Sequence, residues 1–381
     1  KEGACFGVSG EYERPMWYAK NNEKAEYKYS FDYQNWYPSV EFETKNTITN
    51  VGLYELSPFS KYEIKGEQAH SELQRICTAN IKNEIGKSTY TQMLNEAGGI
   101  EADLTVICIE KNHFRIISSA ATRTHDKAHI EKHLSHALEF NDITDDLVCL
   151  GIFGPKSRNL ISKISNDDFK NETFKFGTGK LITINSKKVW AQRLSYVGEL
   201  GFEIYINNKD AKEVYQLIVE EGKNHNLSHC GSHAMDTMRM ESGFLHWGHD
   251  ISPEENQYEA GLNFAISYKK EVNFIGKESL LKIKDKKKDK RFVMLSLKNS
   301  KPGEPLLLHE EPIYLNNKII GRTTSGNYSF NYNKNLSFGY IDSEYSNKQL
   351  ANMNLYIEVA KQKHLAVVEI SPLKNKSARF L

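Results

Sequence analysis

Residues 90–107, YTQMLNEAGGIEADLTVI, contain two strand-like segments on either side of a paired glycine. Gly98-Gly99 signals a hairpin turn, because glycine tolerates the positive φ angles that tight hairpin loops require. The run from Leu104 to Ile109 is apolar and has the length of a buried strand. The stretch therefore predicts a β-hairpin, with Asp103 at the start of the buried part of its second strand.

Asp103 can be interpreted in two ways. A carboxylate at the mouth of a buried strand is partly desolvated, which suits a general base or a hydrogen-bond acceptor. An aspartate at the end of a strand can equally cap a turn, with no part in any chemistry. The residues alone leave both interpretations open.

Strand-like and helix-like segments alternate around this hairpin, from about residue 46 to residue 265. Apolar residues at helical spacing predict helices at 67–79, in the second part of 118–138, and at 210–221. Residues 188–193 and 201–206 have the pattern of two paired strands around a turn. This mixture predicts an α+β architecture.

The turn between those two strands carries a second candidate group. Gly198 and Gly201 let the backbone turn tightly, and Glu203 follows within an apolar run. A buried glutamate needs a partner. A ligand edge with two N–H donors would serve, and so would an internal arginine such as Arg193 or Arg239.

Both ends of the chain differ in composition from the middle. Residues 1–45 are rich in aromatic side chains and poor in aliphatic ones, which predicts a connecting arm that packs on another part of the protein. The charge run at 282–291 predicts a solvated linker. Beyond it, residues 292–381 alternate apolar positions with turn signals, which predicts a small all-β domain.

Composition limits the classes of function. A length of 381 residues is enough for two or three domains. The 50 basic and 49 acidic side chains leave a net charge of +1, which gives no support to a nucleic-acid or membrane-surface partner. No apolar run reaches the length of a membrane-spanning helix. The five cysteines include no CxxC pair, which argues against a disulfide framework and favours a reducing compartment.

Two other kinds of site fit the sequence poorly. The segment Gly86-Lys87-Ser88-Thr89 resembles the end of a phosphate-binding loop, but Ile81 stands where that loop needs a glycine. The possible metal ligands of the 229–249 region have neither a second cysteine pair nor a His-Glu-x-x-His motif. We expect no metal site, and packing roles for His229, Cys230, His233, His246 and His249.

Several motifs occur in the order in which they occur in one known family. Besides residues 90–107 these are VGLYELSPFSKYEIKG at 51–66, LGIFGPKSR at 150–158, YVGELGFE at 196–203, DTMRMESG at 236–243 and GRTTSG at 321–326. In these motifs the chain resembles the glycine-cleavage T-protein (aminomethyltransferase) family, over about residues 46 to 381. The resemblance implies a three-lobed ring of two α+β subdomains and a C-terminal all-β domain.

Two further motifs resemble one branch of that family, the dimethylglycine and sarcosine dehydrogenases. They are GEYERPMWY at 10–18 and HWGHD at 246–250. This likeness implies that a flavoprotein half precedes residue 1, and that residues 1–45 are the connecting arm from it. Residues 46–283 would then form the folate-binding domain, and residues 284–381 the C-terminal β-barrel. The chain lacks the GxGxxG fingerprint, so FAD is expected only in the missing N-terminal half.

The resemblance also implies roles for seven residues. Asp103 matches the family's essential acidic residue beside the N5 and N10 atoms of tetrahydrofolate, and is the expected catalytic residue. Glu203 matches the carboxylate that accepts the amino and N3 donors of the pterin. The other expected folate contacts are Tyr90, Tyr196, Phe59 and Trp247, with Arg239 as the candidate for the folate tail.

The sequence departs from the family at one binding position. Stand-alone T-proteins have Ala-Arg-Asp where this chain has Ala234-Met235-Asp236, so the arginine that helps to bind the folate tail is absent there. Another cation must replace it, or tail binding is weaker.

The implied reaction is the capture of formaldehyde, or of a methylene iminium from a flavin site, as 5,10-methylenetetrahydrofolate. The implied partners are folate, a small methylated amine and the flavoprotein half, in the cytoplasm or, in a eukaryote, the mitochondrial matrix. Two alternatives remain, a folate-binding module without catalysis and a demethylase that acts on another methylated compound. Asp103 argues against the first, because binding alone needs no acid at that edge.

Overall fold

The computed structural model describes residues 2–9, 12–20, 23–286, 288–374 and 378. A six-stranded sheet has the order β10-β11-β12-β9-β3-β13, antiparallel except for the parallel pair β13 and β3. Its strands are β3 (Val51–Glu55), β9 (Leu147–Phe153), β10 (Gly179–Ile184), β11 (Lys187–Gln192), β12 (Gly201–Asn207) and β13 (Leu227–Cys230).

The second sheet is antiparallel throughout and has the order β5-β6-β7-β4-β8. Its strands are β4 (Ser60–Lys65), β5 (Ser88–Leu94), β6 (Ile100–Glu110), β7 (His113–Ser118) and β8 (Glu139–Asp142). The predicted hairpin around Gly98-Gly99 is confirmed as β5 and β6, and Gly98 has a φ of 94°.

The two sheets face one another across the central hydrophobic cluster. Tyr54, Phe153 and Tyr205 of the six-stranded sheet share this cluster with Ile107 and Ile109 of β6. The outer face of the six-stranded sheet packs on α4 (Ser157–Ile164) and α5 (Asn208–Gly222). The outer face of the five-stranded sheet packs on α2 (Ala69–Ile76) and α3 (Arg123–His133).

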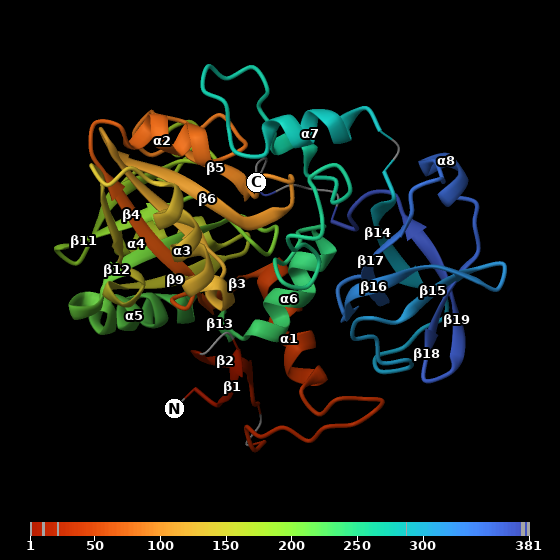
Figure 1. The fold of residues 1–381 in the computed structure, drawn as a ribbon. Helices are drawn as coiled ribbons and strands as arrows, with labels where there is room; N and C mark the ends of the chain where they lie inside the picture. The colour runs from red at the N-terminus through yellow and green to blue at the C-terminus, as the bar shows by residue number, and fades with distance from the viewer. Residues whose placement is uncertain (1, 10–11, 21–22, 287, 375–377, 379–381) are drawn as a thin grey trace.

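A closed six-stranded barrel forms the C-terminal lobe, in the order β14-β17-β16-β15-β18-β19. Its strands are β14 (Lys290–Leu297), β15 (Pro312–Leu315), β16 (Lys318–Ser329), β17 (Lys334–Asp342), β18 (Leu355–Val359) and β19 (Gln362–Glu369), with the short helix α8 (Asn347–Leu350). Two helices, α1 (Tyr37–Thr49) and α6 (Ser232–Glu241), lie between this barrel and the two sheets (Figure 1). The predicted all-β domain is confirmed.

Most of the predicted helices and strands are confirmed with small changes of boundary. The helix predicted at 67–79 is α2, the helix at the end of 118–138 is α3, and the helix at 210–221 is α5. The predicted strand pair is β11 and β12, which run antiparallel. The linker prediction at 282–291 was partly wrong. Its first residues complete α7 (Lys277–Lys284) and its last begin β14, because the apolar face of α7 packs on Gly98 and continues into the charge run.

The N-terminal arm packs on the rest of the molecule, as its composition predicts. Strands β1 (Ala4–Ser9) and β2 (Tyr12–Tyr18) form a hairpin whose Cys5 and Trp17 belong to the central cluster. Glu43 of α1 fastens the arm, because its carboxylate accepts the backbone N–H groups of Tyr18 and Gly231 over 2.7 and 2.8 Å. All five cysteines are buried and free of disulfides. Among the described residues, no helix is both long and apolar enough to cross a bilayer.

Candidate functional site

Asp103 projects into the space between the two sheets. Side chains alternate along a strand. Leu104 and Val106 face the outer helices, and the Asp103 side of β6 is therefore the side of Ile107 in the central cluster. Glu203 behaves in the same way on β12, where Phe202 and Ile204 face outward and Tyr205 lies in the central cluster. The two carboxylates thus project from opposite sheets into one interlayer space.

Asp103 is held by its neighbour on the hairpin. Gln92 stands directly opposite it in the β5–β6 register, and the Gln92 amide donates to Asp103 Oδ1 over 2.6 Å. Burial raises the pKa of Asp103 to about 6, although hydrogen bonds from Gln92 and Tyr90 oppose the shift and Asp126 of α3 adds to it. A carboxylate with such a pKa is charged at neutral pH and remains basic enough to accept a proton.

Gln92 is in turn fixed by Gln257. The Gln257 amide donates to Gln92 Oε1 over 2.5 Å and to the Thr78 hydroxyl over 3.1 Å. Because Gln92 Oε1 accepts from Gln257, the NH₂ group of Gln92 faces Asp103. A donor in this place favours the ionised form of the Asp103 carboxylate. The sequence did not reveal either glutamine as part of the site. Hairpin register could have identified Gln92, but no local signal points to Gln257.

Tyr90 is a partly exposed side chain on β5. It exposes 38% of its surface, yet burial raises its pKa, and the charges of Asp103 and Tyr196 contribute to that shift. The ring of Tyr90 stacks on Phe264, with ring centroids 6.1 Å apart.

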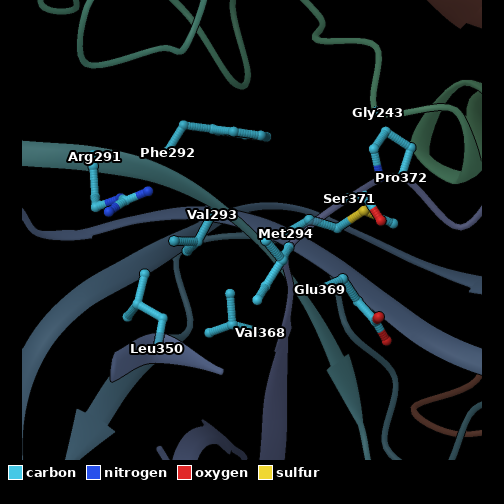
Figure 2. A pocket seen from close by; sticks show the side chains of 11 residues that line it. Gly243, Arg291, Phe292, Val293, Met294, Leu350, Val368, Glu369, Ser371 and Pro372 are labelled. Atoms are coloured by element: carbon cyan, nitrogen blue, oxygen red, sulfur yellow. The ribbon is translucent and has the colours of Figure 1, made fainter. Parts of the chain in front are cut away.

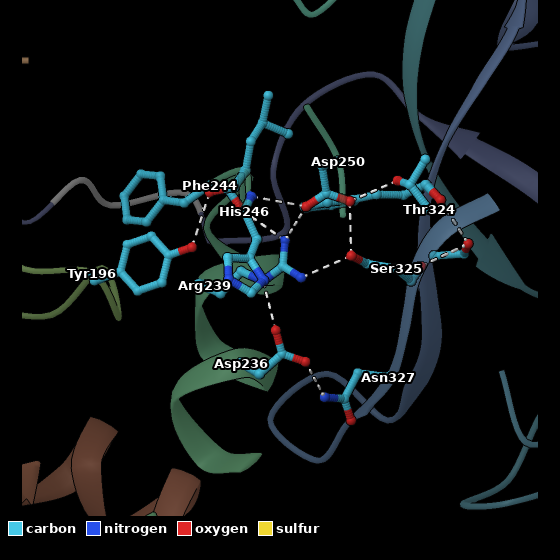
Figure 3. Close-up of polar contacts among 12 residues, drawn as sticks. Tyr196, Asp236, Arg239, Phe244, His246, Asp250, Thr324, Ser325 and Asn327 are labelled. Atoms are coloured by element: carbon cyan, nitrogen blue, oxygen red, sulfur yellow. Dashed lines mark hydrogen bonds and ion pairs between the residues drawn. The ribbon is translucent and has the colours of Figure 1, made fainter. Parts of the chain in front are cut away.

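Tyr196 packs on the central cluster. Burial raises its pKa, and the charge of Asp103 adds to that shift. The Tyr196 hydroxyl donates to the carbonyl of Leu245 over 2.9 Å, and its ring stacks on Phe244 at 6.0 Å. Figure 3 shows the ring turned away from the polar network of α6, with its hydroxyl directed to the loop after that helix.

Glu203 is a half-buried carboxylate to which one side-chain donor is assigned among the described hydrogen bonds. Tyr205 donates its hydroxyl to Glu203 Oε2 over 2.7 Å, and burial raises the pKa of Glu203. An ionised carboxylate has about four acceptor positions. Neither arginine considered as a partner is paired with it among the described ion pairs, since Arg193 donates to the carbonyl of Phe174 and Arg239 lies in a different network.

Arg239 is placed differently from our expectation for the folate tail. It is 2% exposed, and its guanidinium donates to Asp236, Asp250, Ser325 and the carbonyl of Phe244. Asp250 also accepts from Thr324 and Ser325 of β16, so the network joins α6 to the barrel (Figure 3). These contacts give the Arg239 guanidinium internal partners, and its binding of the folate tail stays a prediction.

The two weaker candidates pack on different hydrophobic clusters. Phe59 is half-buried, packs on the central cluster and has the Arg14 guanidinium 5.7 Å from its ring centroid. Trp247 is half-buried, donates its indole N–H to the carbonyl of Ile100 over 3.1 Å and packs beside His125. This hydrogen bond ties Trp247 to Ile100, the first residue of β6, which lies three residues before Asp103.

The histidines of the 229–249 region have packing partners. Tyr215 bonds His229, Tyr27 bonds His233, and His246 stacks on His249. Among the described residues, no group of three or more His, Cys, Asp or Glu side chains is arranged to hold a metal ion.

One pocket lies away from this site. It has a volume of about 170 Å³ and lies between β14 and the segment after β19 (Figure 2). Pockets for ligands of drug size occupy roughly 300–1,000 Å³. None of the seven candidate residues lines it, and we assign no ligand to it. Its lining residues include Gly243, Met294, Val368, Glu369 and Pro372.

Comparison with known proteins identifies the family. The model for the GCVT N-terminal domain matches residues 1–270, and the model for the glycine cleavage T-protein C-terminal barrel domain matches residues 290–373. The chain belongs to the glycine cleavage T-protein family. A solved aminomethyltransferase T of the glycine cleavage system from Bartonella henselae has the same fold, with a TM-score of 0.84, 20% identity, and coverage of 99% of this chain and 96% of that one. The predicted three-lobed fold class is thereby confirmed.

The relatives of this T-protein family member fall into two groups. An aminomethyltransferase from Listeria monocytogenes is 31% identical over 86% of this chain and 89% of its own length. The formaldehyde-forming 4-methylaminobutanoate oxidase of Paenarthrobacter nicotinovorans is 37% identical over 86% of this chain, and the mitochondrial dimethylglycine dehydrogenase of Rattus norvegicus is 32% identical over 98%. This chain spans 39% and 43% of those two proteins, about two fifths of their length.

Proposed function

We propose that the chain binds tetrahydrofolate between the two sheets and transfers a one-carbon unit to it. The observation that carries the proposal is the pair of carboxylates, Asp103 and Glu203, that project from opposite sheets into one space. Their partners differ. Asp103 is held by an amide and keeps a pKa of about 6, whereas Glu203 has unused acceptor positions.

Glu203 fits the pterin. The pterin edge offers an amino group and the N3–H, two donors that a carboxylate accepts side by side. A half-buried carboxylate with one tyrosine hydroxyl as its partner can accept such a ligand, whose two donors would replace the water that a partly exposed carboxylate binds. The planar ring would lie against Tyr196 and Tyr90, whose faces border the same space.

Asp103 fits the reactive edge. Tetrahydrofolate supplies the N5 and N10 atoms that carry the one-carbon unit. Asp103 would accept the N10 proton, with Gln92 holding the carboxylate in place for that transfer. The protein would thus contribute by positioning the reacting atoms and by accepting the N10 proton.

The donor is the second part of the proposal. The dehydrogenase and oxidase relatives are more than twice as long as this chain, and the oxidase is named as formaldehyde-forming. We infer that a flavoprotein half precedes residues 1–45 and supplies formaldehyde or a methylene iminium from a small methylated amine. FAD belongs to that half. Residues 46–283 then receive the one-carbon unit and residues 284–381 form the barrel. Five free cysteines suit the cytoplasm or a mitochondrial matrix.

Calorimetry with folinic acid tests the binding step. A site that buries a ligand of this size should give a dissociation constant in roughly the micromolar range. The same ligand should raise the melting temperature of the chain. No heat and no thermal shift at millimolar ligand would overturn the proposal.

A further inference from the structure

Arg14 is a buried cation with one unsatisfied edge. It lies on β2 with 9% of its surface exposed. Its Nε and Nη2 atoms are shielded from water, and within the described part of the chain neither has a hydrogen-bond partner. These two atoms form the side-on fork of the guanidinium, the edge that receives both oxygens of a carboxylate.

Two other buried arginines have a carboxylate partner. Arg115 has Glu63 at 2.7 Å, and Arg239 has Asp250 at 2.5 Å. No ion pair among the described residues includes Arg14, and burial lowers the pKa of its guanidinium although the charge of Glu55 opposes that shift. A buried charge without a partner destabilises the fold, so Arg14 is better explained by binding than by stability.

Arg14 lies near a residue of the proposed folate site. Its guanidinium lies 5.7 Å from the centroid of Phe59, and Phe59 packs on the same central cluster as Tyr196. The fork therefore lies beside the central cluster that Tyr196 also borders, inside the protein.

We propose that Arg14 binds the carboxylate of a ligand that enters the space between the two sheets. The inference rests on the proposed function, in which folate brings a carboxylate through its glutamyl tail. A second source of the same group is a methylated amine that is itself an amino acid, if it enters this space rather than the flavoprotein half. A contact with the flavoprotein half is disfavoured, because the fork is shielded from the molecular surface.

Stability provides the first test. Arg14→Met removes an unpaired buried charge, so the melting temperature of the ligand-free chain should stay the same or rise. Arg115→Met is the matched control, since it removes a buried arginine from its carboxylate and should lower the melting temperature. A fall for Arg14→Met as large as that of the control would show that Arg14 is structural and would overturn the proposal.

Calorimetry with three probes provides the second test, on the wild type, Arg14→Met and Arg14→Lys. The probes are folinic acid, 6-methyltetrahydropterin, which has no carboxylate, and N-methylglycine in the presence of saturating folinic acid. Loss of a bidentate charge-assisted contact should weaken binding about tenfold or more. Lysine keeps the charge without the fork and should recover little of the loss.

The pattern of losses identifies the ligand. Weaker binding of folinic acid with unchanged binding of the pterin assigns Arg14 to the folate tail. Weaker binding of N-methylglycine alone assigns it to the amino acid. Unchanged affinity for both carboxylate ligands overturns the proposal, and so does an equal loss for the pterin. If the wild type binds neither folate compound, the proposed function fails, while the melting comparison and N-methylglycine titrated alone still decide on Arg14.

Discussion

Gln92 and Asp103 are cross-strand partners, and the Gln92 amide donates to the Asp103 carboxylate over 2.6 Å. The bond joins an uncharged donor to a group whose burial disfavours its charge. An arginine in this place would hold the pKa of Asp103 far below neutrality and make it a poor base. An amide offsets part of the burial and leaves the pKa at about 6. The choice of partner thus matches the proton transfer that we propose.

Asp103→Asn should separate catalysis from folding. Asparagine keeps the shape of the side chain, so most folate affinity should remain. Formation of methylenetetrahydrofolate should fall about 10²-fold or more, the scale for a lost general base. The assay needs the flavoprotein half attached, because free formaldehyde condenses with tetrahydrofolate unaided. A variant that turns over like the wild type would leave the chain as a folate holder.

The pH dependence of the transfer rate should be sensitive to the hydrogen bond between Gln92 and Gln257. Asp103 accepts a proton only when it is ionised, so the rate should fall about tenfold per pH unit below its pKa of about 6. Gln257→Leu frees the Gln92 amide to turn its oxygen toward Asp103, which favours the protonated acid. The acid limb of the profile should therefore move to higher pH.

A control separates this effect from the general loss of a buried amide. Gln74 is also buried and donates to Asn80, outside the site. Gln74→Leu should lower the stability of the fold and leave the acid limb of the pH–rate profile at the same pH. The titratable groups that act on Asp103 are Tyr90, Tyr196 and Asp126. All of them are intact in both variants. A shift of the acid limb that occurs only in Gln257→Leu is therefore due to the hydrogen bonds from Gln257 to Gln92 and from Gln92 to Asp103.

The sequence predicted this site unevenly, for physical reasons. The alternation along β6 and β12 is local, so it could place Asp103 and Glu203 on the inner faces of their strands. Glycine turn chemistry fixed the hairpin, and hairpin register pairs Gln92 with Asp103. Gln257 lies 165 positions from Gln92 in an irregular loop, where no periodicity indicates a contact.

Arg239 illustrates a second limit of the sequence. We named it as the candidate for the folate tail, but the three-residue spacing from Asp236 already placed an anion on the same helix face. The second carboxylate, Asp250, comes from the loop after α6, and Ser325 comes from the barrel. Only the packing of the lobes brings these groups together, so the sequence could not reveal the burial of the network.

Glu203→Gln should act mainly on binding. The amide places an N–H where the carboxylate faces two pterin donors, so one contact becomes repulsive and the charge assistance is lost. Folinic acid affinity in calorimetry should fall by at least about tenfold, with a rise in the Michaelis constant for tetrahydrofolate. The rate at saturating folate should stay within a few-fold of the wild type. A large fall in that rate with unchanged affinity would place Glu203 in the chemical step instead.

Arg239→Met should distinguish a structural arginine from a folate ligand. The substitution leaves the buried Asp250 without its cation, and breaking a buried pair costs about 3–5 kcal/mol. The hydrogen bonds that Asp250 accepts from Thr324, Ser325 and the backbone of His246 should hold the loss near the lower limit. Urea unfolding at neutral pH measures the change. Asp250→Leu in the same chain removes the stranded carboxylate and should recover part of the loss, because an apolar pair can replace a buried ion pair.

Folate binding in these variants supplies the second readout. Arg239 also donates to the carbonyl of Phe244, and the next residue, Leu245, accepts the Tyr196 hydroxyl. Arg239→Met should therefore loosen Tyr196 and weaken both folinic acid and 6-methyltetrahydropterin to the same modest extent, since the pterin ring is common to them. A cation for the folate tail would behave differently, with a loss confined to folinic acid and little change in the unfolding free energy. That result would return Arg239 to the binding site and leave Asp236 and Asp250 without the structural role that their contacts indicate.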